Sequence, residues 1–95
     1  MPSYLIESYL PRSRSGDLTA EVGRLRRATD ALTAEGVRVR HVRYTFLPED
    51  ELCLHLIEAE SAATVGEASR RAAIEPARVV PALPVAPSEA PGGAP

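Results

Sequence analysis

The sequence predicts an α+β domain whose elements follow in the order β-α-β-β-α-β. Two segments with helical spacing of apolar residues are separated by stretches rich in β-formers, and proline or glycine stands at most boundaries. The 95 residues are 44% hydrophobic and 25% charged, which is typical of a small folded domain. A chain this short buries only a thin core, and association with a second copy often compensates for that.

Local sequence features predict the first strand and the first helix. Residues 3–10, "SYLIESYL", alternate imperfectly and are rich in β-formers, which predicts a strand. "PRSRSGD" interrupts it, and Asp17 is placed to cap a helix that Gly36 is expected to end. The apolar residues at helical spacing are Leu18, Val22, Leu25, Ala28 and Leu32.

The second half of the chain predicts a hairpin, a helix and a last strand. Residues 37–47 and 52–58 are expected strands, joined by the turn sequence "PEDE". Ser61 is expected to cap a helix of small apolar residues, and Pro76 to mark its end. "ARVV" then predicts a short strand, which Pro81 suits to the edge of a sheet.

This order is the split-βαβ arrangement of ferredoxin-like folds. Right-handed crossovers give a four-stranded antiparallel sheet with the first and third strands central and both helices on one face. The other face of the sheet would be bare in a monomer. We expect residues 1–83 to form this domain, and the tail 84–95, rich in Pro, Ala and Gly, to be disordered.

The apolar pattern of the hairpin predicts its register. The pairing that puts every large apolar pair on one face is Phe46–Leu52, Tyr44–Leu54, Val42–Leu56 and Arg40–Glu58. The polar side chains of the hairpin and of the first strand would then share the bare face: Glu7, His41, Arg43, Cys53 and His55. A β-bulge in the second strand would turn His41 elsewhere.

Four of these residues are candidate metal ligands: His55, Cys53, Glu7 and His41. Cys53 and His55 are two apart on a strand, so their side chains point the same way with α-carbons roughly 6 to 7 Å apart. Imidazole, thiolate and carboxylate together suit Ni²⁺, Zn²⁺ or Cu²⁺. The structural alternatives are a histidine buried in a dimer interface and a cysteine that packs as a small hydrophobe.

The composition of the chain and the motifs that it lacks reduce the number of plausible function classes. A net charge of −2 argues against nucleic acid and anionic membranes as partners, and no apolar run is long enough for a membrane span. A single cysteine and no signal-peptide pattern favour the cytoplasm. The only candidate acid–base pair is Glu7 with His55. A cofactor-independent enzyme that uses this pair therefore stays an alternative, as does a non-catalytic assembly module.

Two motifs resemble a known family. "F-x-P-E-D-E-x-C" runs from Phe46 to Cys53, and "EA-x-S" runs from Glu58 to Ser61. With "YLIESYLP" near the start, they resemble a bacterial domain-of-unknown-function family of small ferredoxin-like proteins over roughly residues 3–80. Some members of that family are described as nickel-binding-protein-like. The resemblance implies a homodimer with two sheets facing each other, as in dimeric α/β-barrel proteins. Together with the candidate ligands, this leads us to expect a transition metal or small ligand on the inter-sheet face.

Overall fold

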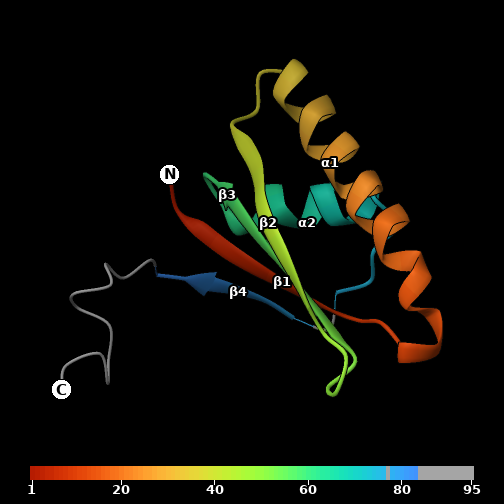
Figure 1. The fold of residues 1–95 in the computed structure, drawn as a ribbon. Coiled ribbons are helices and arrows are strands. Elements are labelled where there is room, and N and C mark those ends of the chain that lie inside the picture. Colours follow the sequence, from red (N-terminus) through yellow and green to blue (C-terminus); the bar gives the residue numbers. More distant parts are fainter. Residues whose placement is uncertain (77, 84–95) are drawn as a thin grey trace, which may run out of the picture.

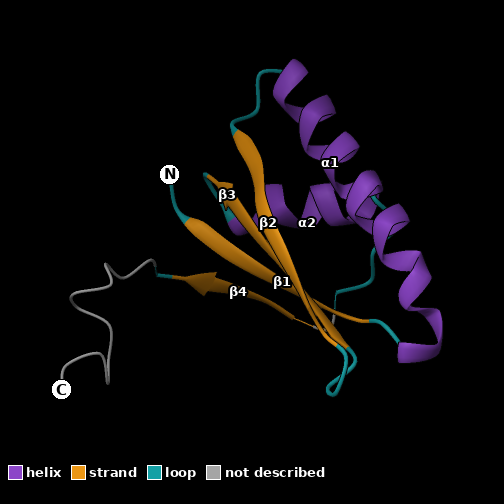
Figure 2. Cartoon of the chain, in the orientation of Figure 1, coloured by secondary structure: helices purple, strands orange, loops and turns teal. Residues whose placement is uncertain are grey.

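Within residues 1–76 and 78–83, which the computed structural model describes, a four-stranded sheet packs against two helices (Figure 1 and Figure 2). The predicted order of elements is confirmed, and a short 3-10 helix precedes the first long helix. The elements are β1 (Ser3–Tyr9), η1 (Arg12–Asp17), α1 (Leu18–Ala34), β2 (Val39–Leu47), β3 (Leu52–Ala59), α2 (Ala62–Arg71) and β4 (Arg78–Ala82).

The sheet has the predicted ferredoxin-like topology. Its strands are antiparallel in the order β2-β3-β1-β4, so β1 and β3 are the central pair. β4 lies at an edge, where proline is tolerated, and it continues through Pro81 to Ala82. α1 lies along β2 and α2 crosses the same side of the sheet, so that within residues 1–76 and 78–83 no helix covers the opposite face (Figure 2).

The ends of α1 agree only partly with prediction. Asp17 precedes the helix, but its side chain makes no capping hydrogen bond and pairs with Arg14 Nη2 at 2.8 Å instead. After Ala34 the chain turns through Gly36, whose φ of +90° is a left-handed conformation that glycine adopts without strain.

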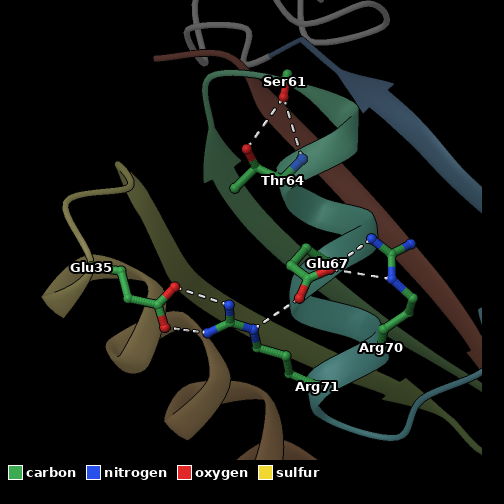
Figure 3. Close-up of polar contacts among 6 residues, drawn as sticks. All are labelled: Glu35, Ser61, Thr64, Glu67, Arg70 and Arg71. Carbon is green, nitrogen blue, oxygen red and sulfur yellow. Dashed lines mark hydrogen bonds and ion pairs between the residues drawn. The ribbon is translucent and has the colours of Figure 1, made fainter.

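α2 begins at the predicted cap, ends at Arg71 and not at the predicted Pro76, and is tied to α1. Ser61 Oγ accepts a hydrogen bond from the backbone N–H of Thr64 at 3.3 Å (Figure 3). Near the other end of α2, the Arg71 guanidinium contacts Glu35 at 2.6 Å and Glu67 at 2.9 Å (Figure 3). Arg71 thus links the last turn of α2 to the residue that caps α1.

The core fills the space between the sheet and the helices. Leu25 of α1 and Val65 of α2 are completely buried against Ile6 and Ile57 of the two central strands. The residues that surround them are small or branched, so the helices lie close to the sheet: Ala28, Leu32, Val39, Ala59, Ala68, Ala72 and Ile74.

The predicted hairpin register is correct at one end and wrong at the other. Arg40 lies opposite Glu58 as expected, and their side chains pair at 2.8 Å. A β-bulge between His41 and Arg43 then shifts the pairing by one residue, so that Phe46 lies opposite Cys53 and not Leu52. Val42 is the extra residue of the bulge and lies opposite no residue of β3.

The predicted faces of β3 are also wrong. Cys53, His55 and Ile57 point toward the helices and are completely buried, whereas the three leucines that alternate with them are only half-buried. The physical reason is polar pairing. Beneath α1 both ring nitrogens of His55 find hydrogen-bond partners, Glu21 and His41, which the bare face does not place beside this strand position. The bare face is therefore the more apolar of the two along this strand: Leu52, Leu54 and Leu56.

Two further predictions concern the C-terminal tail and membrane-spanning helices. The expected disordered tail, residues 84–95, and Ala77 at the start of "ARVV" lie outside the described residues. In the part of the chain that the structure does describe, neither helix has the length and hydropathy needed to cross a membrane.

Candidate functional site

A buried histidine lies at the centre of the candidate site. His55 is in the middle of β3, directly opposite Ile6 of β1, and its side chain is 0% exposed beneath α1. Both ring nitrogens have partners: Nε2 lies 2.8 Å from Glu21 Oε2, and Nδ1 lies 3.2 Å from His41 Nε2. An imidazole in an apolar core is stable only when its nitrogens are satisfied in this way.

Glu21 brings a carboxylate into the core from the first turn of α1. Its side chain is 11% exposed, and Oε2 accepts hydrogen bonds from His55 and from Ser8 Oγ, the latter at 3.1 Å. The hydrogen bond from His55 lowers the pKa of Glu21, and this outweighs the opposing effect of burial. The carboxylate is therefore ionised at neutral pH although it lies between α1 and the sheet.

Cys53 completes the buried group on the same side of β3. Its Sγ lies 3.4 Å from His55 Nε2 and is shielded from solvent. Burial raises the pKa of the Cys53 thiol to about 12, and the neighbouring charge of Glu21 acts in the same direction. Without a metal the side chain is a protonated, unreactive thiol, so this is not the activated nucleophile of a cysteine enzyme.

His41 connects the buried group to the surface. It precedes the bulge in β2, and its Nδ1 accepts a hydrogen bond from Arg26 Nε of α1 at 3.2 Å. The Tyr44 ring stacks against the His41 ring, with 6.4 Å between the ring centroids, and its centroid lies 6.5 Å from that of the His55 ring. Burial, followed by the charges of His55 and Arg26, lowers the pKa of His41 to about 4.

Among the residues that the structure describes, the side chains that could hold a metal are Glu21, Cys53 and His55. One donor atom from each lies within 4.8 Å of the other two, and all three residues are buried. A carboxylate oxygen, a thiol sulfur and an imidazole nitrogen are the donors that Zn²⁺ and its neighbours in the transition series accept. Three protein donors leave room in a tetrahedral shell for one further ligand.

The structure brings three of the four sequence-predicted ligands together, but on the other face of the sheet. Cys53, His55 and His41 are neighbours beneath α1, whereas the expected position was the bare face. Glu7 is not with them. It lies opposite Leu54, points to the bare face and forms an ion pair with Arg78 at 2.9 Å.

This separation also removes the predicted acid–base pair. Alternation along β1 and β3 places Glu7 and His55 on opposite sides of the sheet, so Glu7 cannot orient His55 as a general base. The carboxylate that contacts His55 comes from α1 instead.

Sequence reasoning missed Glu21, although a pattern in the helix indicates it. Glu21 precedes Leu25 by four residues and Ala28 by seven, so it lies on the apolar face of α1. A carboxylate on the inner face of a helix needs a buried partner, and His55 is that partner.

Comparisons with known proteins agree with the fold and add no activity. No family model and no curated protein matches the chain. The fold is similar to the crystal structure of the protein SCO4226 from Streptomyces coelicolor A3(2), with a TM-score of 0.68 and 16% sequence identity over 88% of this chain and 99% of that one. The chain is therefore a small ferredoxin-like α+β domain with a buried glutamate–cysteine–histidine group under its first helix.

Proposed function

We propose that this domain binds one divalent transition-metal ion, of the Ni²⁺, Zn²⁺ or Cu²⁺ class, through Glu21, Cys53 and His55. The observation that carries the proposal is the convergence of three different donor types within 4.8 Å in the core. Exposed acidic clusters are common without a metal, but a buried carboxylate beside a thiol and an imidazole is not needed for packing. The sequence resemblance to a family with nickel-binding-like members points to the same chemistry.

Binding of the metal ion would release one proton, that of the Cys53 thiol. The thiol of Cys53 loses its proton to become a thiolate ligand, and His55 contributes the lone pair of Nε2, the nitrogen nearest to both other donors. The negative charges of Glu21 and of the thiolate then offset the charge of the ion, which compensates for its desolvation in the core.

The test compares two glutamates of the same domain. Glu21→Gln removes the proposed carboxylate ligand, and Glu7→Gln removes a carboxylate on the other side of the sheet that pairs with Arg78. We expect Ni²⁺, Zn²⁺ and Cu²⁺ titrations under anaerobic conditions to give one ion per chain for wild type and Glu7→Gln. Glu21→Gln should bind the ion at least about tenfold more weakly, since loss of a residue that contacts the metal lowers the affinity more than loss of a residue that only orients a ligand.

A spectroscopic measurement identifies the thiolate. Co²⁺ bound to the protein should show a thiolate-to-metal charge-transfer band, and Cys53→Ser should lack it while keeping the fold by circular dichroism. Equal affinity of Glu21→Gln and Glu7→Gln for every ion, or a wild-type Co²⁺ complex without the band, would contradict the proposed site.

We also propose that the bare face of the sheet pairs with a second copy of the chain. The supporting observation is a hollow of about 290 Å³ on that face, whose lining includes half-buried leucines of the two central strands: Leu5, Leu54 and Leu56. Two such faces related by a two-fold axis would bury their leucines against each other, and facing hollows would leave space for a small organic ligand.

Sedimentation equilibrium tests the pairing. Leu54→Arg puts a charge on the proposed interface and should yield a monomer, whereas Ala63→Arg adds the same charge at an exposed position of α2 and should leave the mass of a dimer. A wild-type protein that sediments as a monomer at high micromolar concentration would refute the pairing and leave the metal proposal intact.

A further inference from the structure

A directional hydrogen-bond chain runs from the surface to the proposed metal site. Arg26 Nε–H donates to His41 Nδ1 at 3.2 Å, and a guanidinium group has donors only. The lone pair of His41 Nδ1 is therefore occupied, so the neutral ring carries its hydrogen on Nε2. That hydrogen points at His55 Nδ1, 3.2 Å away, which must accept.

The same logic fixes the hydrogen of His55. With Nδ1 accepting from His41, the neutral His55 ring carries its hydrogen on Nε2, where Glu21 Oε2 accepts it at 2.8 Å. Every donor in the chain then meets an acceptor: Arg26 to His41, His41 to His55, His55 to Glu21. The arginine at the surface thus determines which nitrogen of the buried histidine is protonated.

This arrangement is incompatible with metal ligation by His55. The ion needs the lone pair of Nε2, so the hydrogen must be on Nδ1 and His41 Nε2 must accept it. The His41 hydrogen then has to be on Nδ1, facing the Arg26 Nε–H. Two donors cannot share one hydrogen bond, so Arg26 must leave His41. Each imidazole ring keeps one hydrogen throughout.

We infer that Arg26 is a positioning residue. It holds the His41–His55 pair in the tautomer in which His55 Nε2 carries a hydrogen and cannot bind a metal ion, so that metal binding requires Arg26 to release His41. The inference rests on the proposed metal site. Arg26 is well placed for the role because its side chain is exposed, and its other contact is with the Tyr44 ring, 6.0 Å from the guanidinium carbon. Neither contact is buried, so release of Arg26 leaves no unsatisfied group in the core.

Two neighbouring arginines make a matched test. Arg26→Met removes the donor to His41, and Arg27→Met removes the same charge from the next position of α1, where the guanidinium lies beside Gly23. Long-range proton–nitrogen correlation spectra of the metal-free proteins report the tautomer of each histidine. We expect hydrogen on Nε2 of both rings in wild type and Arg27→Met, and a mixture of His41 tautomers in Arg26→Met.

Zn²⁺ titration of the same proteins measures the consequence. Arg26→Met should bind Zn²⁺ between about 2-fold and 12-fold more tightly than Arg27→Met, the range that corresponds to one net hydrogen bond. Wild-type spectra with hydrogen on Nδ1 of His55, or equal Zn²⁺ affinity of the two variants, would overturn the inference while the metal site stands. If no protein binds Zn²⁺, Ni²⁺ or Cu²⁺, the site itself fails, and the wild-type titration alone reveals that.

Discussion

Replacement of Glu21 by leucine should destabilise the domain far more than replacement of a surface glutamate. Leucine fits the space approximately but accepts no hydrogen bond, so His55 Nε2–H and Ser8 Oγ–H lose their partner in a buried position. An unsatisfied buried polar group costs about 1 to 3 kcal/mol, and the added apolar burial returns part of that. We expect the free energy of unfolding to fall by about 3 kcal/mol.

That loss is a large fraction of the total. A domain of this size is stable by roughly 4 to 12 kcal/mol, and with a urea m-value of about 1.5 kcal/mol per molar the midpoint should fall by about 2 M. The assay is urea unfolding followed by circular dichroism at pH 7 in the presence of a chelator. The m-value should be unchanged, which would show that the loss of stability does not arise from a change in the denatured state.

Glu67→Leu is the matched control. Glu67 also lies on a helix and pairs with two arginines, Arg70 and Arg71, but these pairs are on the surface (Figure 3). Surface ion pairs contribute little, so this variant should lose a small fraction of what Glu21→Leu loses. If the two variants unfold at the same urea concentration, Glu21 does not satisfy buried donors and the description of the site is wrong.

Three smaller predictions test other parts of the description. The pKa of His41 is lowered from 6.5 to about 4, so stability is lost as pH falls through this window, and His41→Gln should abolish about 1 kcal/mol of that loss after solvent screening. Gly36→Ala should cost about 1 kcal/mol because of its φ of +90°, whereas Gly16→Ala, with open space and no such φ, should cost almost nothing in thermal unfolding. Cys53 should react with a thiol reagent only at the rate of unfolding, since it is buried with its pKa raised to about 12.

Local patterns were sufficient to predict the fold. The helical spacing of α1, the Ser61 cap and the prolines each depend on neighbours in sequence, and right-handed crossovers then leave few topologies. These features gave the strand order and the edge position of β4 that the structure has. Gly36 was identified for the same reason, because the end of a helix requires a left-handed residue there.

The faces of β3 could not be predicted from its own sequence. Both alternating sets contain apolar residues, so a period of two divides the strand correctly but does not say which set faces the helices. That choice depends on how closely the helices approach, and on Glu21, which comes from another element and satisfies His55. The bulge at Val42 has the same character, since it places Tyr44 and not Arg43 opposite the buried histidine.

Removal of both buried polar partners distinguishes a site kept for function from one kept for stability. Glu21→Leu and His55→Leu should each destabilise the metal-free protein, because each leaves the other polar group buried without its partner. The double variant leaves neither, and two leucines of similar volume can pack in their place. It should therefore recover at least half of the summed loss, which chemical denaturation of all four proteins in a double-mutant cycle measures. Additive losses would mean that the pair is not coupled. Recovery to the wild-type level would mean that folding does not require the polar group, so that its presence under α1 is explained by what it binds.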